Sequence, residues 1–177
     1  MTTLTEIRKR ITGTARAQAS RYAHGDERPL GGYAVTMGVY GGTLAVLAAA
    51  VRLSGRDLPS GLSPGDITLC AASTHKLSRL LAKDPVTSPF RAPFTSYRGT
   101  EGPAELDEEV RGHGARKTVG ELVTCPFCLS MWLSTGLVAG LILLPKPTRI
   151  AMGGLTALAG ADMLQFAHAW LDKAASG

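Results

Sequence analysis

Long apolar segments alternate with charged segments along this chain, and the alternation predicts a membrane protein. Leu30 to Val51 carries no charge over a length sufficient to cross a hydrocarbon core of about 30 Å. Further segments of this kind follow after a short linker rich in Gly, Pro and Ser. The pattern predicts an all-α membrane protein with a four-span domain at residues 30–172. The expected transmembrane helices are residues 30–53, 66–82, 126–144 and 149–171.

The segment 66–82 is the least typical of the four expected spans. It has about the minimum length that crosses a bilayer, and it carries His75, Lys76 and Arg79. The alternative is a helix that lies flat at the membrane surface. We favour a span because of the distribution of basic residues described next.

Basic residues are concentrated on one side of the expected membrane. With four spans, thirteen Lys and Arg residues fall in the first 29 residues, the loop 83–125 and the C-terminus, and four fall on the other side. Because cytoplasmic segments are enriched in Lys and Arg, we expect a multi-pass protein of the cell membrane with both termini and the loop 83–125 in the cytoplasm. The same rule explains the net charge of +5, so nucleic acid is not expected as a partner.

The cytoplasmic segments differ in expected structure. Residues 1–29 form a basic arm, in which residues 5–22 have the pattern of an amphipathic helix suited to anionic lipid or of a merely solvated arm. Residues 83–94 contain three prolines, which favour an extended path without regular helix. Residues 99–114 combine glycines with acidic side chains and are expected to be flexible. Gly38 with Gly42, and Gly136 with Gly140, have the spacing of closely packed helices.

A polar cluster is predicted at membrane depth. Charged side chains are costly there and face other helices or a water-filled cavity. Spans two and four are expected to run in the same direction, which places Asp162 level with the basic residues of span two. The cluster serves either as a structural ion pair or as a proton or ion path. Its members are His75, Lys76, Arg79, Asp162, Gln165 and His168.

Cys125-Pro-Phe-Cys128 is the sharpest short motif. Both thiols are expected in the first turn of the third span, where the helix dipole favours a thiolate. Such a pair fits thiol redox chemistry, half of a zinc site or interfacial packing. His113 or a second copy of the chain is the expected source of further zinc ligands.

A second candidate site lies just after the second span. Basic and hydroxyl side chains in this short segment are suited to a phosphate or lipid headgroup. Alternatively, Arg91 holds the loop against helix ends through backbone carbonyls or Asp84. The candidate residues are Lys83, Asp84, Thr87, Ser88 and Arg91.

Three ordered blocks give the chain a resemblance to a known family. They are KDPVTSPFRAPF at 83–94, GELVTCPFC at 120–128 followed by Trp132, and GADMLQ at 160–165. Together they resemble the bacterial family of small integral membrane proteins catalogued as domain of unknown function 1360. The resemblance covers about residues 65–169. It implies a membrane location and no established activity.

The function expected from these observations is that of a non-enzymatic membrane factor. It would bind a partner, another membrane protein or a further copy of itself, or a lipid headgroup, at its cytoplasmic face. The alternative is a thiol oxidoreductase or metal-binding protein that uses Cys125 and Cys128, with zinc as the metal. A weaker alternative is a small transporter that uses Asp162 with His75 or Arg79. The sequence leaves open whether the protein is an enzyme.

Overall fold

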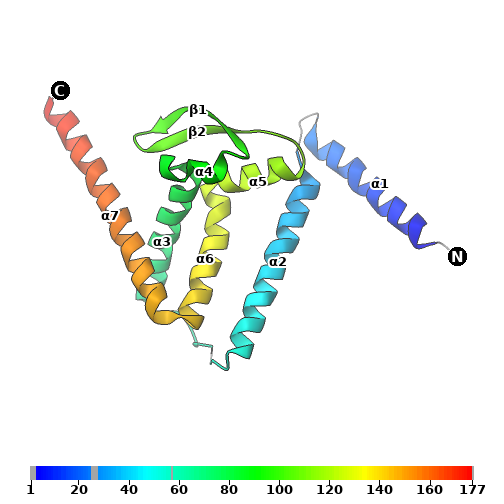
Figure 1. Cartoon of the computed structure of the whole chain (residues 1–177), viewed down its shortest axis with the longest axis horizontal. Coiled ribbons are helices and arrows are strands. Elements are labelled where there is room, and N and C mark those ends of the chain that lie inside the picture. The colour runs from blue at the N-terminus through cyan, green and yellow to red at the C-terminus, as the bar shows by residue number, and fades with distance from the viewer. Residues whose placement is uncertain (1–2, 25–27, 57, 177) are drawn as a thin grey trace.

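Helices dominate the computed structural model, which describes residues 3–24, 28–56 and 58–176 (Figure 1). The long helices are α1 (Leu4–Ala23), α2 (Leu30–Leu53), α3 (Pro64–Lys83), α6 (Pro126–Leu143) and α7 (Pro145–Ser176). The shorter elements are the 3-10 turn η1 (Pro85–Thr87), the helices α4 (Ser88–Arg91) and α5 (Ala115–Thr124), and the strands β1 (Thr95–Gly102) and β2 (Glu105–Val110).

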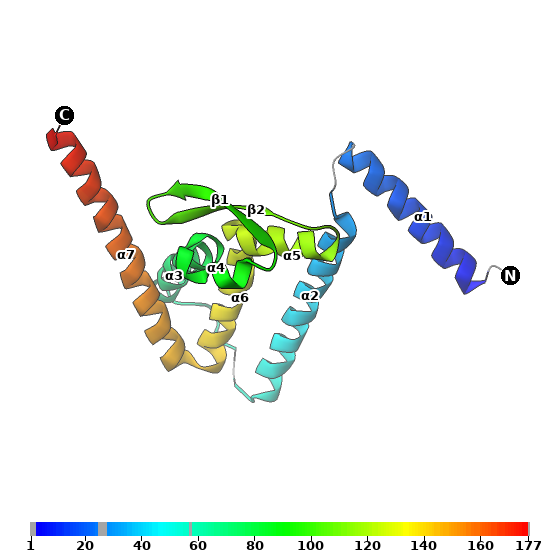
Figure 2. The ribbon, with the colours of Figure 1, turned by 45° about the horizontal axis from the view of Figure 1, so that its top comes forward.

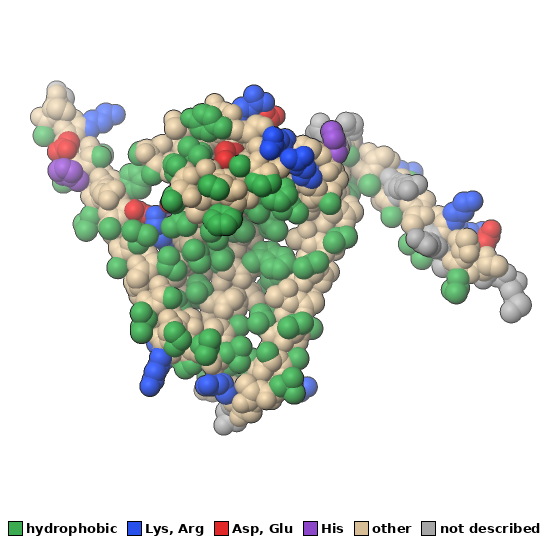
Figure 3. Space-filling view, viewed as in Figure 1, with side chains coloured by type: hydrophobic (Ala, Val, Ile, Leu, Met, Phe, Trp, Pro, Cys, Tyr) green, Lys and Arg blue, Asp and Glu red, His purple; other side chains and the backbone are tan. Residues whose placement is uncertain are grey.

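Three of the described helices, α2, α6 and α7, are long and apolar enough to cross a membrane. Their flanks are covered with apolar side chains, as the green surface in Figure 3 shows. Helix α3 has 20 residues but carries Asp66, Lys76, Arg79 and Lys83. The structure therefore supports a mostly helical protein with apolar helices, and the fourth span stays a prediction.

Helix α3 lies between α6 and α7 and forms the centre of the bundle (Figures 1 and 2). The buried core consists of Cys70, Leu141 and Met152, with partly buried leucines packed around it. Beside this core, the fully buried hydroxyl of Ser73 donates to the carbonyl oxygen of Met152 at 2.8 Å. Small polar residues of this kind let helix backbones approach closely in membranes.

An ion pair closes the bundle at the start of α3. Ser63 caps the helix, because its hydroxyl accepts from the backbone N–H of Asp66 at 3.0 Å. The Asp66 carboxylate in turn accepts two hydrogen bonds from Arg149 of α7, at 2.8 and 2.9 Å. This contact fixes the start of α3 against the first turns of α7.

The chain between α3 and α6 is folded, and this corrects the all-α prediction. Strands β1 and β2 pair antiparallel from Thr95 with Val110 to Gly102 with Glu105, and two irregularities interrupt β1. The turn between them begins with Pro103, whose fixed φ suits a tight turn. The prediction that residues 99–114 are flexible is wrong for residues 99–110, because the two strands pair and Glu101 and Glu105 find basic partners on α3.

The prolines also act differently from the expectation. Pro85 begins η1 and Pro89 lies in the first turn of α4, so residues 83–94 are not extended as predicted. Pro145 likewise begins α7, where a turn was expected. In a first helical turn the missing proline N–H removes no hydrogen bond, and the fixed φ favours the helix.

The two expected glycine pairs are used little within the chain. A methyl group added at Gly38, Gly42 or Gly136 would meet no described atom within 4 Å. Gly140 does adjoin the side chain of Thr148, with 2.8 Å between the added carbon and Oγ1. The close contact of α2 is made instead by Gly32, which lies against Thr118 of α5.

The predicted helix at residues 5–22 is present as α1, and its contact with lipid stays a prediction. Met1, Thr2 and residues 25–27 of the expected basic arm lie outside the described residues. The hairpin, α4, α5, the start of α2 and the C-terminus lie toward one end of the long helices, which we call the hairpin end (Figure 1). The linker 54–63 and the turn between α6 and α7 lie at the opposite end (Figure 1).

Candidate functional site

The basic face of α3 meets a row of acidic side chains, and we call this contact the charged seam. Lys76, Arg79 and Lys83 lie three and four residues apart, so they share one face of the helix. Each of them forms an ion pair with a different acidic residue. The acidic partners are Asp162 of α7, Glu105 of β2 and Glu101 of β1.

The hairpin supplies the strongest geometry of the seam. Arg79 donates from Nε and Nη2 to the two carboxylate oxygens of Glu105, at 2.7 and 2.6 Å. Such two-point pairing orients the partner as well as attracting it. Lys83 pairs with Glu101, and this contact lowers the pKa of the Glu101 carboxyl below its ordinary value. The hairpin is thereby held along the last two turns of α3.

Arg91 fixes the base of the hairpin from inside the protein. Its side chain is only 1% exposed, and its Nε lies 2.5 Å from a carboxylate oxygen of Glu108. The remaining donors reach the carbonyl oxygens of Leu81 and Asp84, at 2.8 and 3.0 Å, and the Thr87 hydroxyl at 2.7 Å. Since Arg91 satisfies the C-terminal carbonyls of α3, its geometry is that of a structural residue.

The headgroup site expected after α3 is therefore divided. Arg91 and Thr87 are buried, and the Thr87 hydroxyl donates to the carbonyl oxygen of Leu80 at 2.5 Å. Lys83, Asp84 and Ser88 are half-buried, and Lys83 is already paired with Glu101. The five residues line the base of the hairpin and do not form one open anion site.

The predicted intramembrane cluster is only partly assembled. Lys76 Nζ lies 2.7 Å from Asp162 Oδ2, with 13% and 36% of the two side chains exposed. Arg79 belongs to Glu105 instead, and His75 is exposed. The other two predicted members, Gln165 and His168, lie on the exposed last part of α7, where His168 is 3.4 Å from Asp172. The structure thus brings together one ion pair of the six-residue set, formed by Lys76 and Asp162.

The two cysteines lie at the start of α6, as expected from the motif. Cys125 caps the helix, because its Sγ accepts from the backbone N–H of Cys128 at 3.1 Å. Cys128 is exposed, whereas Cys70 is buried in the core of the bundle. Among the described residues, no group of three His, Cys, Asp or Glu side chains is arranged to hold a metal ion. His113 therefore does not complete a zinc site with these thiols within one copy.

Sequence reasoning missed the acidic residues that define the site. Glu101, Glu105 and Glu108 fell in the segment expected to be flexible. A signal was present, because a basic segment at 76–91 is followed directly by an acidic one at 101–109. Segments of opposite charge attract each other, and the turn at 103–104 folds the acidic segment into a hairpin that carries Glu101 and Glu105 to α3.

A second polar contact joins α2 to the hairpin end. The Tyr33 hydroxyl donates to Glu121 of α5 at 2.5 Å, and Gly32 adjoins Thr118 on the same helix. Deeper along α2, the Tyr40 hydroxyl lies 2.8 Å from that of Thr135 on α6. These contacts help attach α2, one of the three apolar helices, to the rest of the bundle.

Comparison with known proteins places the chain in a family. The family profile described as protein of unknown function (DUF1360) matches residues 69–168, which is more than half of the chain. The chain is also similar to sporulation protein YjcA of Bacillus subtilis (strain 168), with 27% identity over 99 residues, 53% of this chain and 84% of that relative. No solved structure matches the chain. The chain belongs to the DUF1360 family, which confirms the resemblance seen in its sequence blocks.

Proposed function

We propose that this DUF1360 member is a non-enzymatic, four-span membrane protein that binds a protein partner at its hairpin end. The observation that carries the proposal is the charged seam. The basic residues after the centre of α3 are engaged by the protein's own hairpin, which is thereby held firmly above the helices. A platform held in this way is suited to displaying a surface to a partner.

Helix α3 is taken as the fourth span on two grounds. It packs along α6 and α7, which are both apolar enough to cross a membrane. In addition, the thirteen-to-four distribution of basic residues agrees with the positive-inside rule only when the hairpin end is cytoplasmic. Both termini and the hairpin then share the cytoplasmic side of the cell membrane.

A protein partner fits the hairpin end better than a lipid headgroup does. The Arg91 guanidinium is buried and Lys83 is paired, so neither is open to a phosphate. Apolar and aromatic side chains are also exposed at this end, among them Val86, Phe90 and Tyr97, which are 76%, 75% and 64% exposed. Exposed aromatic side chains are enriched in protein–protein interfaces. Helices α3 and α5 contact β2 more extensively than β1, although Lys83 of α3 reaches Glu101 of β1.

The name of the relative leaves the activity open. Its printed name assigns it to sporulation, which is a cellular process and specifies no reaction. The metal-binding and transport alternatives each need something that the structure of one copy does not show. Zinc would need ligands from a second copy, and transport through Asp162 would need the Lys76 ion pair to open.

The proposal is tested by photo-crosslinking in intact cells that express the full chain. A photoreactive phenylalanine analogue replaces Tyr97, Phe90 or, as the matched control, Val46, which is 68% exposed in the middle of α2. We expect a protein adduct of one defined mass from the first two positions and lipid adducts alone from Val46. The adduct should persist in a Cys125→Ser, Cys128→Ser variant.

Lipid adducts alone at Tyr97 and Phe90 would contradict a protein partner. Loss of the protein adduct in the cysteine variant, together with zinc in the purified protein that Cys125→Ser removes, would favour the metal-binding alternative instead.

A further inference from the structure

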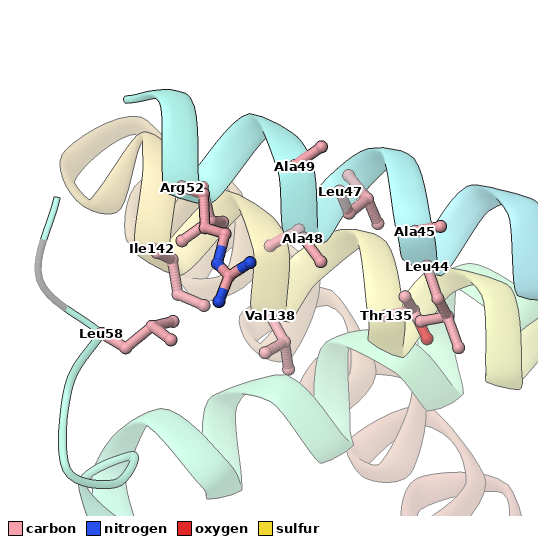
Figure 4. Close-up of a pocket in the computed structure, with 12 residues that line it drawn as sticks. Leu44, Ala45, Leu47, Ala48, Ala49, Arg52, Leu58, Thr135, Val138 and Ile142 are labelled. Atoms are coloured by element: carbon pink, nitrogen blue, oxygen red, sulfur yellow. The ribbon is translucent and has the colours of Figure 1, made fainter. Parts of the chain in front are cut away.

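An apolar groove separates α2 from α6 toward the end of the bundle opposite the hairpin (Figure 4). It has a volume of about 510 Å³, within the range of about 300–1,000 Å³ that is usual for small-ligand sites. Leu58 of the following linker contributes to its wall. Most of the lining is aliphatic, including Leu44, Leu47, Val138 and Ile142.

The groove follows from the small residues of α2. Ala45, Ala48 and Ala49 of α2 are among the residues that line the groove, and such short side chains leave the space between the helices unfilled. Above the groove, α2 is held to α6 where Tyr40 packs edge to face on Trp132, with 5.1 Å between the ring centroids, and hydrogen-bonds to Thr135. The two helices are therefore held together at Tyr40 and lie apart along the groove.

Arg52 gives the groove a charge at its mouth. Figure 4 shows its guanidinium pointing from α2 into the space between Val138, Ile142 and Leu58. No ion pair or side-chain hydrogen bond joins this guanidinium to another described residue. By contrast, Arg149 at the same end is paired with Asp66. Arg52 lies one residue before the end of α2, at the level where a spanning helix meets the headgroups.

We propose that this groove binds an anionic phospholipid, with one acyl chain between α2 and α6 and the phosphate at Arg52. The apolar walls exclude a ligand that is polar throughout, and the unpaired guanidinium selects for negative charge. Lys146 is also exposed at this end of the molecule, where Lys and Arg side chains are visible in Figure 3. The site lies away from the hairpin end and is independent of partner binding there.

Native mass spectrometry of the purified full-length protein tests the proposal. Phosphatidylglycerol and phosphatidylcholine with the same acyl chains are titrated separately into the detergent-solubilised protein. We expect one phosphatidylglycerol to bind at least about tenfold more tightly than phosphatidylcholine. Both lipids offer a phosphate to Arg52, but only phosphatidylglycerol has a net negative charge, so only it makes the charge-assisted contact at full strength. Arg52→Gln should abolish this preference, and Arg52→Lys should retain part of it.

The matched control is Arg56→Gln, which removes a nearby charge that does not line the groove and should leave the preference unchanged. Ala48→Phe, which fills the groove, should weaken the binding of both lipids. The proposal is overturned if the preference survives Arg52→Gln, or if Arg56→Gln reduces it equally. Equal binding of the two lipids to the unmodified protein would mean ordinary boundary lipid and would overturn it as well.

Discussion

Helices α2 and α3 have similar lengths and opposite roles. Helix α2 is strongly apolar, yet Val51 is its only residue classed as buried among those described. Helix α3 carries four charged residues, yet it lies at the centre, with Asp66, Ser73, Thr74 and Ser78 buried. In a soluble protein the apolar helix would be expected inside.

The reversal is what a bilayer predicts. Lipid solvates an apolar helix as well as other helices do, so hydrophobicity alone does not draw α2 inward. A polar side chain in lipid is costly, so α3 gains from partners on every side. Its hydroxyl groups contact α7, and its basic residues meet the acids of α7 and the hairpin. The predictions that follow test this contrast.

The largest effect is expected at the buried pair of Arg91 and Glu108, at the base of the hairpin. Arg91→Leu leaves Glu108, which is only 7% exposed, and two carbonyl oxygens of the α3 terminus without their donor. Removing one member of a buried pair costs about 3–5 kcal/mol. We expect a loss of that size in the free energy of unfolding, measured by denaturant titration in detergent.

The control for this prediction is Arg98→Leu. Arg98 pairs with Glu109 on the exposed face of the hairpin, with both side chains more than half exposed. Exposed pairs contribute about 0–1 kcal/mol. Equal losses from the two substitutions would show that the pair of Arg91 and Glu108 is not buried as described.

The ion pair between α3 and α7 should give the next largest effect. Asp162→Leu strands Lys76, but Asp162 is 36% exposed, so we expect a loss of about 2 kcal/mol, below the range of about 3–5 kcal/mol for fully buried pairs. The double variant Lys76→Leu, Asp162→Leu should recover part of this loss. A double-mutant cycle in which Arg79→Leu recovers more than Lys76→Leu would contradict the observed pairing.

Helix α2 allows a matched comparison of two glycines. A methyl group at Gly32 would lie 2.0 Å from Oγ1 and 2.9 Å from Cβ of Thr118, so Gly32→Ala forces α2 away from α5. We expect a loss of about 1–2 kcal/mol, within the range for overpacking, because rotation of the Thr118 side chain does not move its Cβ away. Gly38→Ala meets no described atom within 4 Å and should be neutral or slightly stabilising. The midpoints of thermal unfolding of the two variants, each compared with the wild type, test this prediction.

The smallest effect concerns pH at the hairpin. Lys83 holds the pKa of Glu101 below its ordinary value of 4.5, so this contact stabilises the folded state above that pH. Its contribution is lost as the pH falls through the lowered, folded-state pKa. Glu101→Gln should therefore unfold at a slightly lower temperature than the wild type at neutral pH, and the two midpoints should converge well below pH 4.5. A difference that persists in acid would assign the effect to another cause.

The helices were largely predictable from the sequence, because continuous apolar segments determine them. Residues 30–53 and 126–143 match the predicted first and third spans within one residue, and α7 extends the predicted fourth at both ends. The hairpin was not predictable from local composition. Residues 99–114 are rich in Gly and Glu, and what orders them is a set of cations on α3 that lie more than fifteen positions earlier in the chain.

The candidate site was likewise predictable only in part. An acidic partner for span two was expected at Asp162, because depth in the membrane can be counted along a helix, and Lys76 lies there. The choice between Lys76 and Arg79 was not predictable, since it depends on Glu105 of the hairpin. The role of Arg91 as a buried residue likewise depends on Glu108, whose position no local pattern specifies.

The position of α3 in the chain has a consequence for biosynthesis. The groups that neutralise it, Glu101, Glu105 and Asp162, are all translated after it, and so are α6 and α7, which cover it. Machinery that selects helices by hydrophobicity therefore meets α3 while its three basic side chains have no counterions. With α3 as the proposed fourth span, its entry into the bilayer should depend on the arrival of α7, and truncation of the chain before Asp162 should leave α3 at the membrane surface.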